Sequence, residues 1–183
     1  MTRLLLLLVL LLTAPSAYAN MCPRTPNDFK QNILLTVLSG QEKTKVMETL
    51  SYAIDFSSIA ERSLKNHWFS LPLAKKEEFK RTLKDLMVNN YANKFAGEIK
   101  SYSLTWSHKS SSTFSVLADV TQEDVDSTLE FFVSKTQLNC WKISDIIVDE
   151  VSIVDNYREQ FTLIVVKHGF DHLLSRMKAK VKV

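Results

Sequence analysis

The chain has 183 residues, with 23 lysines and arginines against 20 acidic residues and a formal net charge of +3 at pH 7. This near-neutral balance argues against nucleic acid as a partner, because nucleic-acid binding depends on an excess of cations. With only three glycines and four prolines, and with no linker, repeat or low-complexity segment, the sequence predicts one unit with a sizeable core.

The first 19 residues predict a cleaved secretory signal peptide. Arg3 supplies a minimal positive charge, Leu4 to Leu12 form an apolar run, and Ala17-Tyr18-Ala19 is a small-x-small cleavage site. This run is far shorter than the about 20 residues that a membrane span needs, so an uncleaved anchor is the weaker alternative. We therefore expect an exported mature chain in which residues 20–183 form a single domain.

The two cysteines, Cys22 and Cys140, lie in neither a C-x-x-C motif nor a metal-ligand spacing. Export would place them where disulfides persist, and an even number of exported cysteines usually pairs. We favour a disulfide that ties the N-terminal arm to the last large strand, with two free thiols as the alternative.

Four helices are expected in the first half of the chain. Thr25 and Pro26 predict the cap and first position of a helix that reaches about Ser39 and stops at Gly40. Two more are expected over residues 41–53 and, after an Asp55 cap, over about 57–65. The fourth, near 73–95, carries one apolar stripe on its surface: Phe79, Leu83, Leu86, Met87, Tyr91 and Phe95.

After Gly97 the hydrophobic period changes from that of a helix to that of a strand. Three runs alternate with polar residues and are joined by short polar turns: Tyr102, Leu104 and Trp106; Phe114, Val116, Ala118 and Val120; Val125, Leu129, Phe131 and Val133. A fourth strand begins at Trp141, and its alternation predicts Trp141, Ile143, Asp145 and Ile147 on one face. A short strand over 151–154 follows.

The chain then returns to helical period, with helices expected over 155–167 and, after a stop at Gly169, over 170–180. The fold class is therefore α+β: N-terminal helices, a curved antiparallel sheet of four to five strands, and C-terminal helices. We expect the long helix and the C-terminal helix to cover the apolar face of the sheet.

Few residues suggest catalysis or metal binding. His168 and His172 are four apart, but Gly169 lies between them and breaks the helical spacing, so we expect no metal site. Asp145 is the one candidate for a general acid or base, as in a small pocketed isomerase. Such an aspartate more often caps or ties a turn, and we expect a protein that is not an enzyme, with no catalytic residue and no cofactor.

Two blocks of this sequence resemble the MlaC-like family of periplasmic phospholipid carriers, also called toluene-tolerance auxiliary proteins. The C-terminal block runs from Trp141 to Phe161, with a tryptophan strand, an Asp turn, a Ser-hydrophobic-hydrophobic strand and a Tyr-Arg-x-x-Phe helix start, and it continues over 169–174. The N-terminal block comprises Asp55-Phe56, Ile59-Ala60, Leu64, Trp68, Phe79 and Tyr91. The chain departs from the family at Lys65 and Glu150, where members usually or often have glycine.

The resemblance implies a monomeric carrier that moves phospholipid between outer and inner membranes as the soluble component of an ABC-type transport system. Its implied partners are an outer-membrane lipoprotein–porin complex and an inner-membrane ABC transporter with an MCE component. An NTF2-like sheet–helix arrangement is compatible with this expectation. The alternatives are a carrier of another apolar lipid such as a hopanoid, an isomerase-like enzyme, and a structural adaptor with a solid core.

The resemblance also favours a lined apolar pocket between sheet and helices, a choice that composition leaves open. The residues expected to bind lipid come from the long helix, the strands and the first C-terminal helix: Leu86, Tyr91, Leu104, Trp106, Val116, Phe131, Val133, Trp141, Ile143, Tyr157, Phe161 and Ile164.

Overall fold

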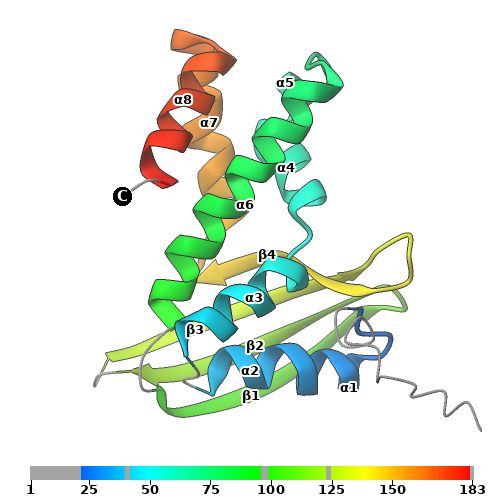
Figure 1. The fold of residues 1–183 in the computed structure, drawn as a ribbon. Helices are drawn as coiled ribbons and strands as arrows, with labels where there is room; N and C mark the ends of the chain where they lie inside the picture. The colour runs from blue at the N-terminus through cyan, green and yellow to red at the C-terminus, as the bar shows by residue number, and fades with distance from the viewer. Residues whose placement is uncertain (1–21, 40–41, 96–98, 123–124, 182–183) are drawn as a thin grey trace, which may run out of the picture.

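The computed structural model describes residues 22–39, 42–95, 99–122 and 125–181, and for 93–95 it describes the backbone alone. The expected signal peptide, its cleavage site and the helix stop at Gly40 lie outside the described residues, as do Gly97, after which the period changes, and the side chain of Phe95. In the described part, α-helices precede and follow one five-stranded antiparallel sheet, so the predicted α+β class is confirmed (Figure 1).

The first helical stretch is continuous but not uniform. It comprises α1 (Pro26–Phe29), a π-helical segment η2 (Lys30–Leu34) and α2 (Leu35–Leu38). Its start has the predicted chemistry, because the Thr25 hydroxyl accepts from the Asp28 N–H at 3.0 Å and the Asp28 carboxylate accepts from the Thr25 N–H at 3.0 Å. Two donors at the helix start are thereby satisfied.

The next helices are α3 (Lys43–Ala53), α4 (Phe56–Leu64), the short α5 (Asn66–Phe69) and the long α6 (Leu73–Phe95). Asp55 caps α4 as expected, its Oδ1 accepting from the Ser58 N–H at 3.0 Å. α4 ends before Lys65, whose φ of 50° leaves the helical region, and α5 follows where no separate helix was expected.

The sheet is a simple meander in which each strand pairs with the next along the chain. Its strands are β1 (Ile99–Ser110), β2 (Thr113–Gln122), β3 (Val125–Lys135), β4 (Trp141–Val148) and β5 (Val151–Ser152). The inward alternation predicted for β2 and β3 holds in the strand centres, but Val125 at the strand start is 62 % exposed and Tyr102 on β1 is 41 % exposed. Strand ends reach beyond the helices that cover the sheet.

A β-bulge in β4 overturns the predicted alternation of its second half. Ile143 pairs with Val133, but Asp145 pairs with Phe132, so Ser144 is an extra residue on this strand. Beyond the bulge Ile146, not Ile147, belongs to the core and is 1 % exposed. Asp145 therefore lies on the face opposite to the one predicted, because directly paired residues share a face.

The last strand is shorter than predicted, because a helix begins inside the segment 151–154. The Ser152 hydroxyl accepts from the Asp155 N–H at 3.1 Å, which starts α7 (Ile153–His168) two residues earlier than the hydrophobic pattern suggested. Gly169, at φ 84°, ends α7 as predicted, and α8 (Phe170–Val181) follows. No helix in the described ranges is long and apolar enough to cross a membrane.

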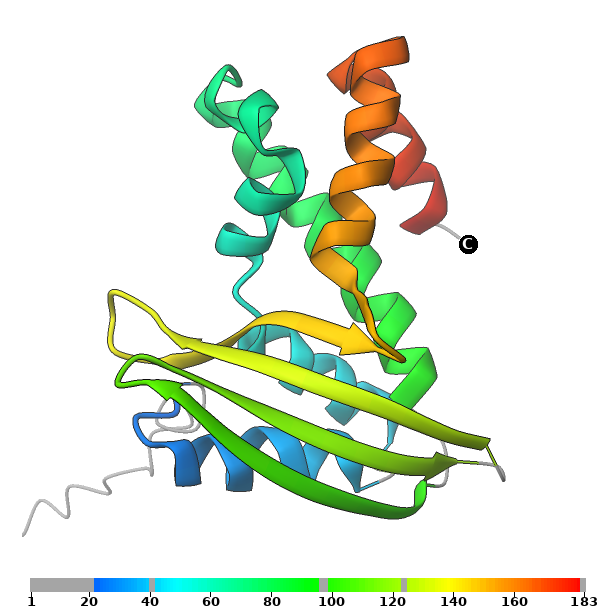
Figure 2. The ribbon, with the colours of Figure 1, turned by 180° about the vertical axis from the view of Figure 1, so that it is seen from behind.

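The helices that cover the sheet differ from the expected ones. α1, α2 and α3 lie along one face, where the rings of Phe29 and Phe114 meet edge to face at 5.7 Å, and Figure 2 shows the opposite face without helices over it. α6 packs mainly against α3, α4 and α8, and α4 and α7 contact β4. The long helix and the C-terminal helices thus form a helical lobe beside the sheet rather than its main cover.

The free edge of β4 before the bulge is closed by three separate parts of the chain. The Trp141 N–H donates to Pro23 O at 2.9 Å, Ile143 O accepts from the Asp55 N–H at 2.8 Å, and Ser144 O accepts from Arg62 Nη1 at 2.8 Å. An open strand edge invites pairing with another chain, and these bonds remove that opportunity. They also fix the position of α4 relative to the sheet.

Candidate functional site

The predicted lining residues on the strands share the sheet face that α1–α3 cover. Val116, Phe131, Val133, Trp141 and Ile143 are at most 5 % exposed there. Leu104 and Trp106, on the edge strand β1, pair with Ala118 and Val116 on the same face and are half-buried. The β-strand period thus identified a common face correctly.

The predicted residues on α6 and α7 lie in the helical lobe. Phe161 stacks on Tyr157, with ring centroids 5.1 Å apart, and meets the edge of Phe79 at 5.7 Å. Leu86 is 5 % exposed, and Tyr91, Tyr157 and Ile164 are half-buried. Both groups belong to one contiguous hydrophobic core.

Two phenylalanines that sequence reasoning left off the lining set are central to these clusters. Phe114 contacts Trp106 and Trp141, with ring centroids 5.3 and 4.8 Å apart, and Phe79 contacts Phe161 and Phe170. Both carried a usable signal, because Phe114 alternates with Val116 on β2 and Phe79 begins the apolar stripe of α6.

Burial divides the twelve predicted residues in two. Seven are at most 5 % exposed, and Val116, Phe131 and Ile143 have no exposed surface, so no water-sized space touches them: Leu86, Val116, Phe131, Val133, Trp141, Ile143 and Phe161. Five are half-buried: Tyr91, Leu104, Trp106, Tyr157 and Ile164. A bulky apolar ligand would first meet this second group.

Two tyrosines place hydroxyl groups at the border of the apolar interior of the helical lobe. Burial raises the pKa of Tyr157, an effect that hydrogen bonds with Asn90 and Tyr91 partly oppose. Burial also raises the pKa of Tyr91 far above its usual range, and the neighbouring Tyr157 and Asp145 act in the same direction. Both phenols are therefore neutral at physiological pH, and each presents an apolar ring with one polar end.

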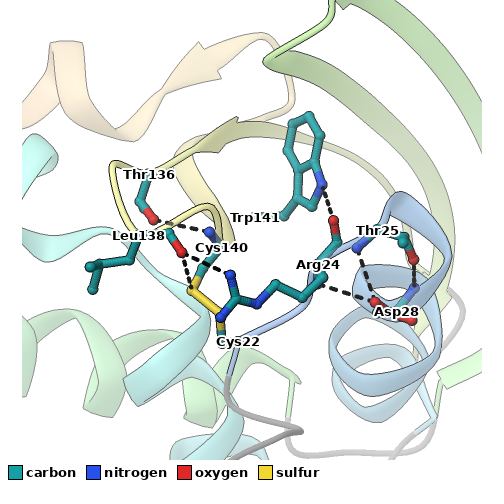
Figure 3. Close-up of a disulfide and its surroundings, with 8 residues drawn as sticks. All are labelled: Cys22, Arg24, Thr25, Asp28, Thr136, Leu138, Cys140 and Trp141. Atoms are coloured by element: carbon teal, nitrogen blue, oxygen red, sulfur yellow. Dashed lines mark hydrogen bonds between the residues drawn. A yellow bond between two sulfur atoms is a disulfide. The ribbon is translucent and has the colours of Figure 1, made fainter.

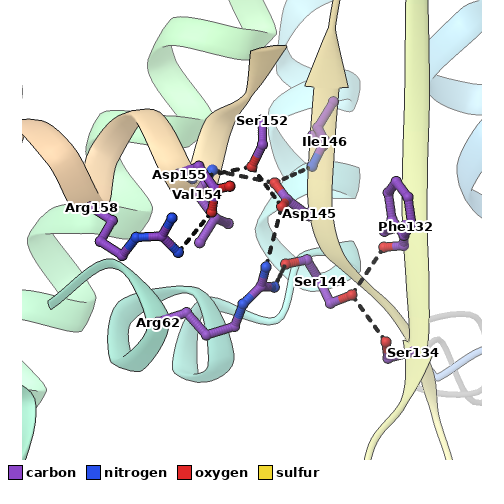
Figure 4. Close-up of polar contacts among 10 residues, drawn as sticks. All are labelled: Arg62, Phe132, Ser134, Ser144, Asp145, Ile146, Ser152, Val154, Asp155 and Arg158. Atoms are coloured by element: carbon purple, nitrogen blue, oxygen red, sulfur yellow. Dashed lines mark hydrogen bonds and ion pairs between the residues drawn. The ribbon is translucent and has the colours of Figure 1, made fainter. Parts of the chain in front are cut away.

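Asp145 forms the polar junction between sheet and helical lobe (Figure 4). Its Oδ1 accepts from the backbone N–H groups of Ile146 at 2.8 Å and Val154 at 3.3 Å. Its Oδ2 accepts from the Ser152 hydroxyl at 2.8 Å and from Arg62 Nη2 at 3.3 Å. This carboxylate thus ties the start of α7 to β4 and α4, so its hydrogen-bonding capacity is spent on structural contacts.

The structure contains the disulfide between Cys22 and Cys140, with Cα atoms 5.0 Å apart (Figure 3). Polar contacts hold the N-terminal arm on the same turn, since Arg24 Nη1 donates to Leu138 O at 3.1 Å and Trp141 Nε1 donates to Arg24 O at 3.2 Å. The arm thereby covers one end of the aromatic cluster around Trp141 and Phe114.

The rings of His168 and His172 lie 4.9 Å apart even though Gly169 separates their helices. Within the described residues no group of three histidine, cysteine, aspartate or glutamate side chains is placed to hold a metal ion. The pair is a contact between the end of α7 and the start of α8.

Comparison with known proteins supports the resemblance noted in the sequence. A search of curated proteins found no match. Among solved structures, a phospholipid-binding protein from Ralstonia solanacearum, solved in complex with a phospholipid, superposes with a TM-score of 0.65 at 17 % identity, covering 80 % of this chain and 85 % of that one. At this identity the likeness shows the fold alone. The family model described as MlaC protein matches residues 35–179, and the chain therefore belongs to the MlaC family.

Proposed function

We propose that this chain binds phospholipid and carries it through the periplasm between the outer and inner membranes. Membership of the MlaC family is the observation that carries the proposal, and the lipid complex of the Ralstonia solanacearum protein with the same fold supports it. The proposal includes export by cleavage after Ala19 and docking to an outer-membrane lipoprotein–porin complex and an inner-membrane MCE/ABC transporter.

A carrier is physically necessary because lipid chains do not leave a membrane readily. Each buried methylene contributes about 0.8 kcal/mol, so one long acyl chain amounts to more than about 10 kcal/mol against water. A carrier must replace the membrane interior, and release then requires a partner that opens the site or competes for the chain.

The acyl chains would enter at the half-buried residues. Tyr157 and Ile164 on α7 and Tyr91 on α6 form one such group, and Leu104 and Trp106 on β1 form the other. The fully buried residues, among them Phe131 and Ile143, would contact lipid only after the helices that cover them move outward. We therefore propose that binding expands a core that is filled in the absence of ligand.

Substitution on α7 tests this assignment. The variant must block lipid without disturbing the fold. A tryptophan at the predicted lining residue Val133 would not meet this condition, because Val133 is 1 % exposed and a larger side chain there would disrupt packing. Ile164→Trp should occupy the entry and lower lipid occupancy several-fold in native mass spectrometry, whereas its neighbour Leu163, which is 55 % exposed, offers the matched control Leu163→Trp. Unchanged occupancy in Ile164→Trp, with native circular dichroism, would reject this entry site.

A structural adaptor with a solid core is the competing function, and the complete burial of Phe131, Val116 and Ile143 favours it. Lipid extraction from wild-type protein purified from a periplasm separates the two. A co-purifying phospholipid supports the carrier, a hopanoid redirects the proposal to another lipid, and a protein that neither retains nor takes up lipid supports the adaptor.

A further inference from the structure

A pocket of about 220 Å³ lies where α3, α4, α6 and β4 meet, and its wall is basic. Lys80, Arg81 and Lys84 reach it from α6, and Lys142 reaches it from β4. Asp55 is the only acidic residue in this lining, all of which belongs to the described part of the chain. We call this space the junction pocket.

The charges of the junction pocket are only partly compensated within the protein, and Glu78 on α6 lies near enough to Arg81 for the two charges to attract each other. The Asp55 carboxylate is engaged in capping α4, and Lys80 pairs with Glu77 outside the lining at 2.8 Å. Among the described residues, no carboxylate lies within ion-pair distance of Arg81, Lys84 or Lys142. Several like charges on one concave surface raise the local concentration of anions.

Part of this wall is held in place before any ligand arrives. Lys84 Nζ sits 5.9 Å from the centroid of the Phe56 ring, a cation–π contact that keeps the ammonium at the rim. Ser57 adds a hydroxyl from the first turn of α4, where backbone N–H groups have no intrahelical acceptor. Hydroxyl, ammonium and guanidinium donors thus converge from three elements.

We propose that the junction pocket binds a phosphate group. A phosphate has several strong acceptor oxygens, which suit the point charges of lysines and the planar donor set of Arg81 better than a single neutral acceptor would. The group could belong to the headgroup of a carried phospholipid or to a free phosphate-bearing molecule. The assignment of this phosphate to a lipid headgroup rests on the proposed function as a phospholipid carrier. The binding of phosphate by the pocket does not depend on that function.

Titration of the mature protein with inorganic phosphate at constant ionic strength, followed by amide chemical shifts in NMR, tests the site. We expect shifts at Ser57, Arg81 and Lys142, and about tenfold weaker binding in the double variant Arg81→Gln, Lys142→Gln, which removes two charge-assisted contacts. The control Lys65→Gln, Arg158→Gln removes the same charge from another basic pocket between α4, α5 and α7 and should bind as wild type does. Equal weakening in both variants, or no shifts at the junction, would overturn the proposal.

Binding of a phospholipid and of a diacylglycerol with the same acyl chains identifies the source of the phosphate. If Arg81→Gln, Lys142→Gln weakens only phospholipid binding, the headgroup occupies the pocket. If the variant weakens inorganic phosphate binding and leaves both lipids unaffected, a free phosphate-bearing molecule does. If the wild-type protein binds neither lipid, the proposed carrier function is rejected. The phosphate site is not rejected by that result, because the titration with inorganic phosphate tests it independently.

Discussion

Arg62 on α4 and Asp145 on β4 form an ion pair, with Nη2 and Oδ2 3.3 Å apart, directly at the β-bulge. The second terminal nitrogen of the guanidinium, Nη1, donates to the carbonyl of the extra residue, Ser144. The bulge turns Asp145 away from the core face and toward the start of α7, so that one carboxylate joins two helices to one strand. These contacts of Asp145 set the orientation of the helical lobe relative to the sheet.

Loss of the Asp145 carboxylate should destabilise the fold more than loss of Arg62. Asp145→Ala leaves the buried N–H groups of Ile146 and Val154 without their acceptor and should cost about 2–3 kcal/mol of unfolding free energy. Arg62→Gln should cost about 1 kcal/mol or less, because the Arg62 side chain is 44 % exposed. Urea unfolding measures both, and equal costs would mean that the ion pair, not the capping, matters.

The Cys22–Cys140 disulfide should contribute strongly to stability, because it joins residues 118 apart in the sequence. In the chain-entropy model a bridge of this span stabilises the folded state by about 4–5 kcal/mol. Replacing both cysteines by serine should therefore lower the denaturation midpoint, and reduction of the wild type should bring it to the same value. If reduction left the midpoint unchanged, the contacts of Arg24 and Trp141 would be enough to hold the N-terminal arm in place and maintain stability without the disulfide.

Among the described residues, four that are not glycine have a positive φ, and two of these, Lys65 and Glu150, are positions where the resemblance noted in the sequence implies glycine. Lys65 has a φ of 50° and Glu150 a φ of 70°. Lys65→Gly and Glu150→Gly should each stabilise the fold by about 0.5–1 kcal/mol, since relief of strain exceeds the entropic cost of glycine.

Asn139 supplies the control for these two glycine variants. Its φ is 64°, but asparagine tolerates this region, so Asn139→Gly should leave the melting temperature nearly unchanged. Melting temperatures from calorimetry measure all three variants. A loss of stability in Lys65→Gly would mean that the lysine side chain makes a contribution larger than the strain.

Acid should loosen the packing of α8 on α6. The hydrogen bond from Lys178 holds the pKa of Glu78 below its usual 4.5, and the nearby Lys75 acts in the same direction. A lowered folded-state pKa contributes stability that is fully present above pH 4.5 and is lost as the pH falls through the folded value. Glu78→Gln should therefore reduce the fall in melting temperature between pH 5 and pH 3.

The ion pairs that join α6 to α8 also weaken at alkaline pH, where Lys75 loses its charge. The hydrogen bond to Asp171 raises the pKa of Lys75 above its usual 10.5, so its contribution is present below that pH and is lost as the pH rises through the folded value. Between pH 5 and pH 9 this network should leave stability unchanged. A steep change within that interval in the wild type, absent in Glu78→Gln, would contradict this account.

Local chemistry in the sequence predicted the elements well. The cap at Thr25 and Asp28, the length of α6, the meander of strands and the stop at Gly169 all depend on nearest neighbours or on a simple period, and each is found where it was expected. The position of Asp145 was wrong because one inserted residue, Ser144, changes the face of everything after it. Periodicity cannot reveal such an insertion, since Ile146 and Ile147 are equally apolar.

The sequence by itself determined the fold class and the common apolar face of the strands, because composition and period are properties of the chain alone. It favoured a disulfide between Cys22 and Cys140 and left two free thiols as the alternative, which the structure excludes. Only the tertiary structure decided which helices cover that face, how Asp145 joins α4 to α7, and how four cations converge beside α4. These depend on packing between segments far apart in the sequence. The hydrophobic pattern allows several arrangements of these helices on the sheet, and close packing of side chains of particular volumes selects one of them.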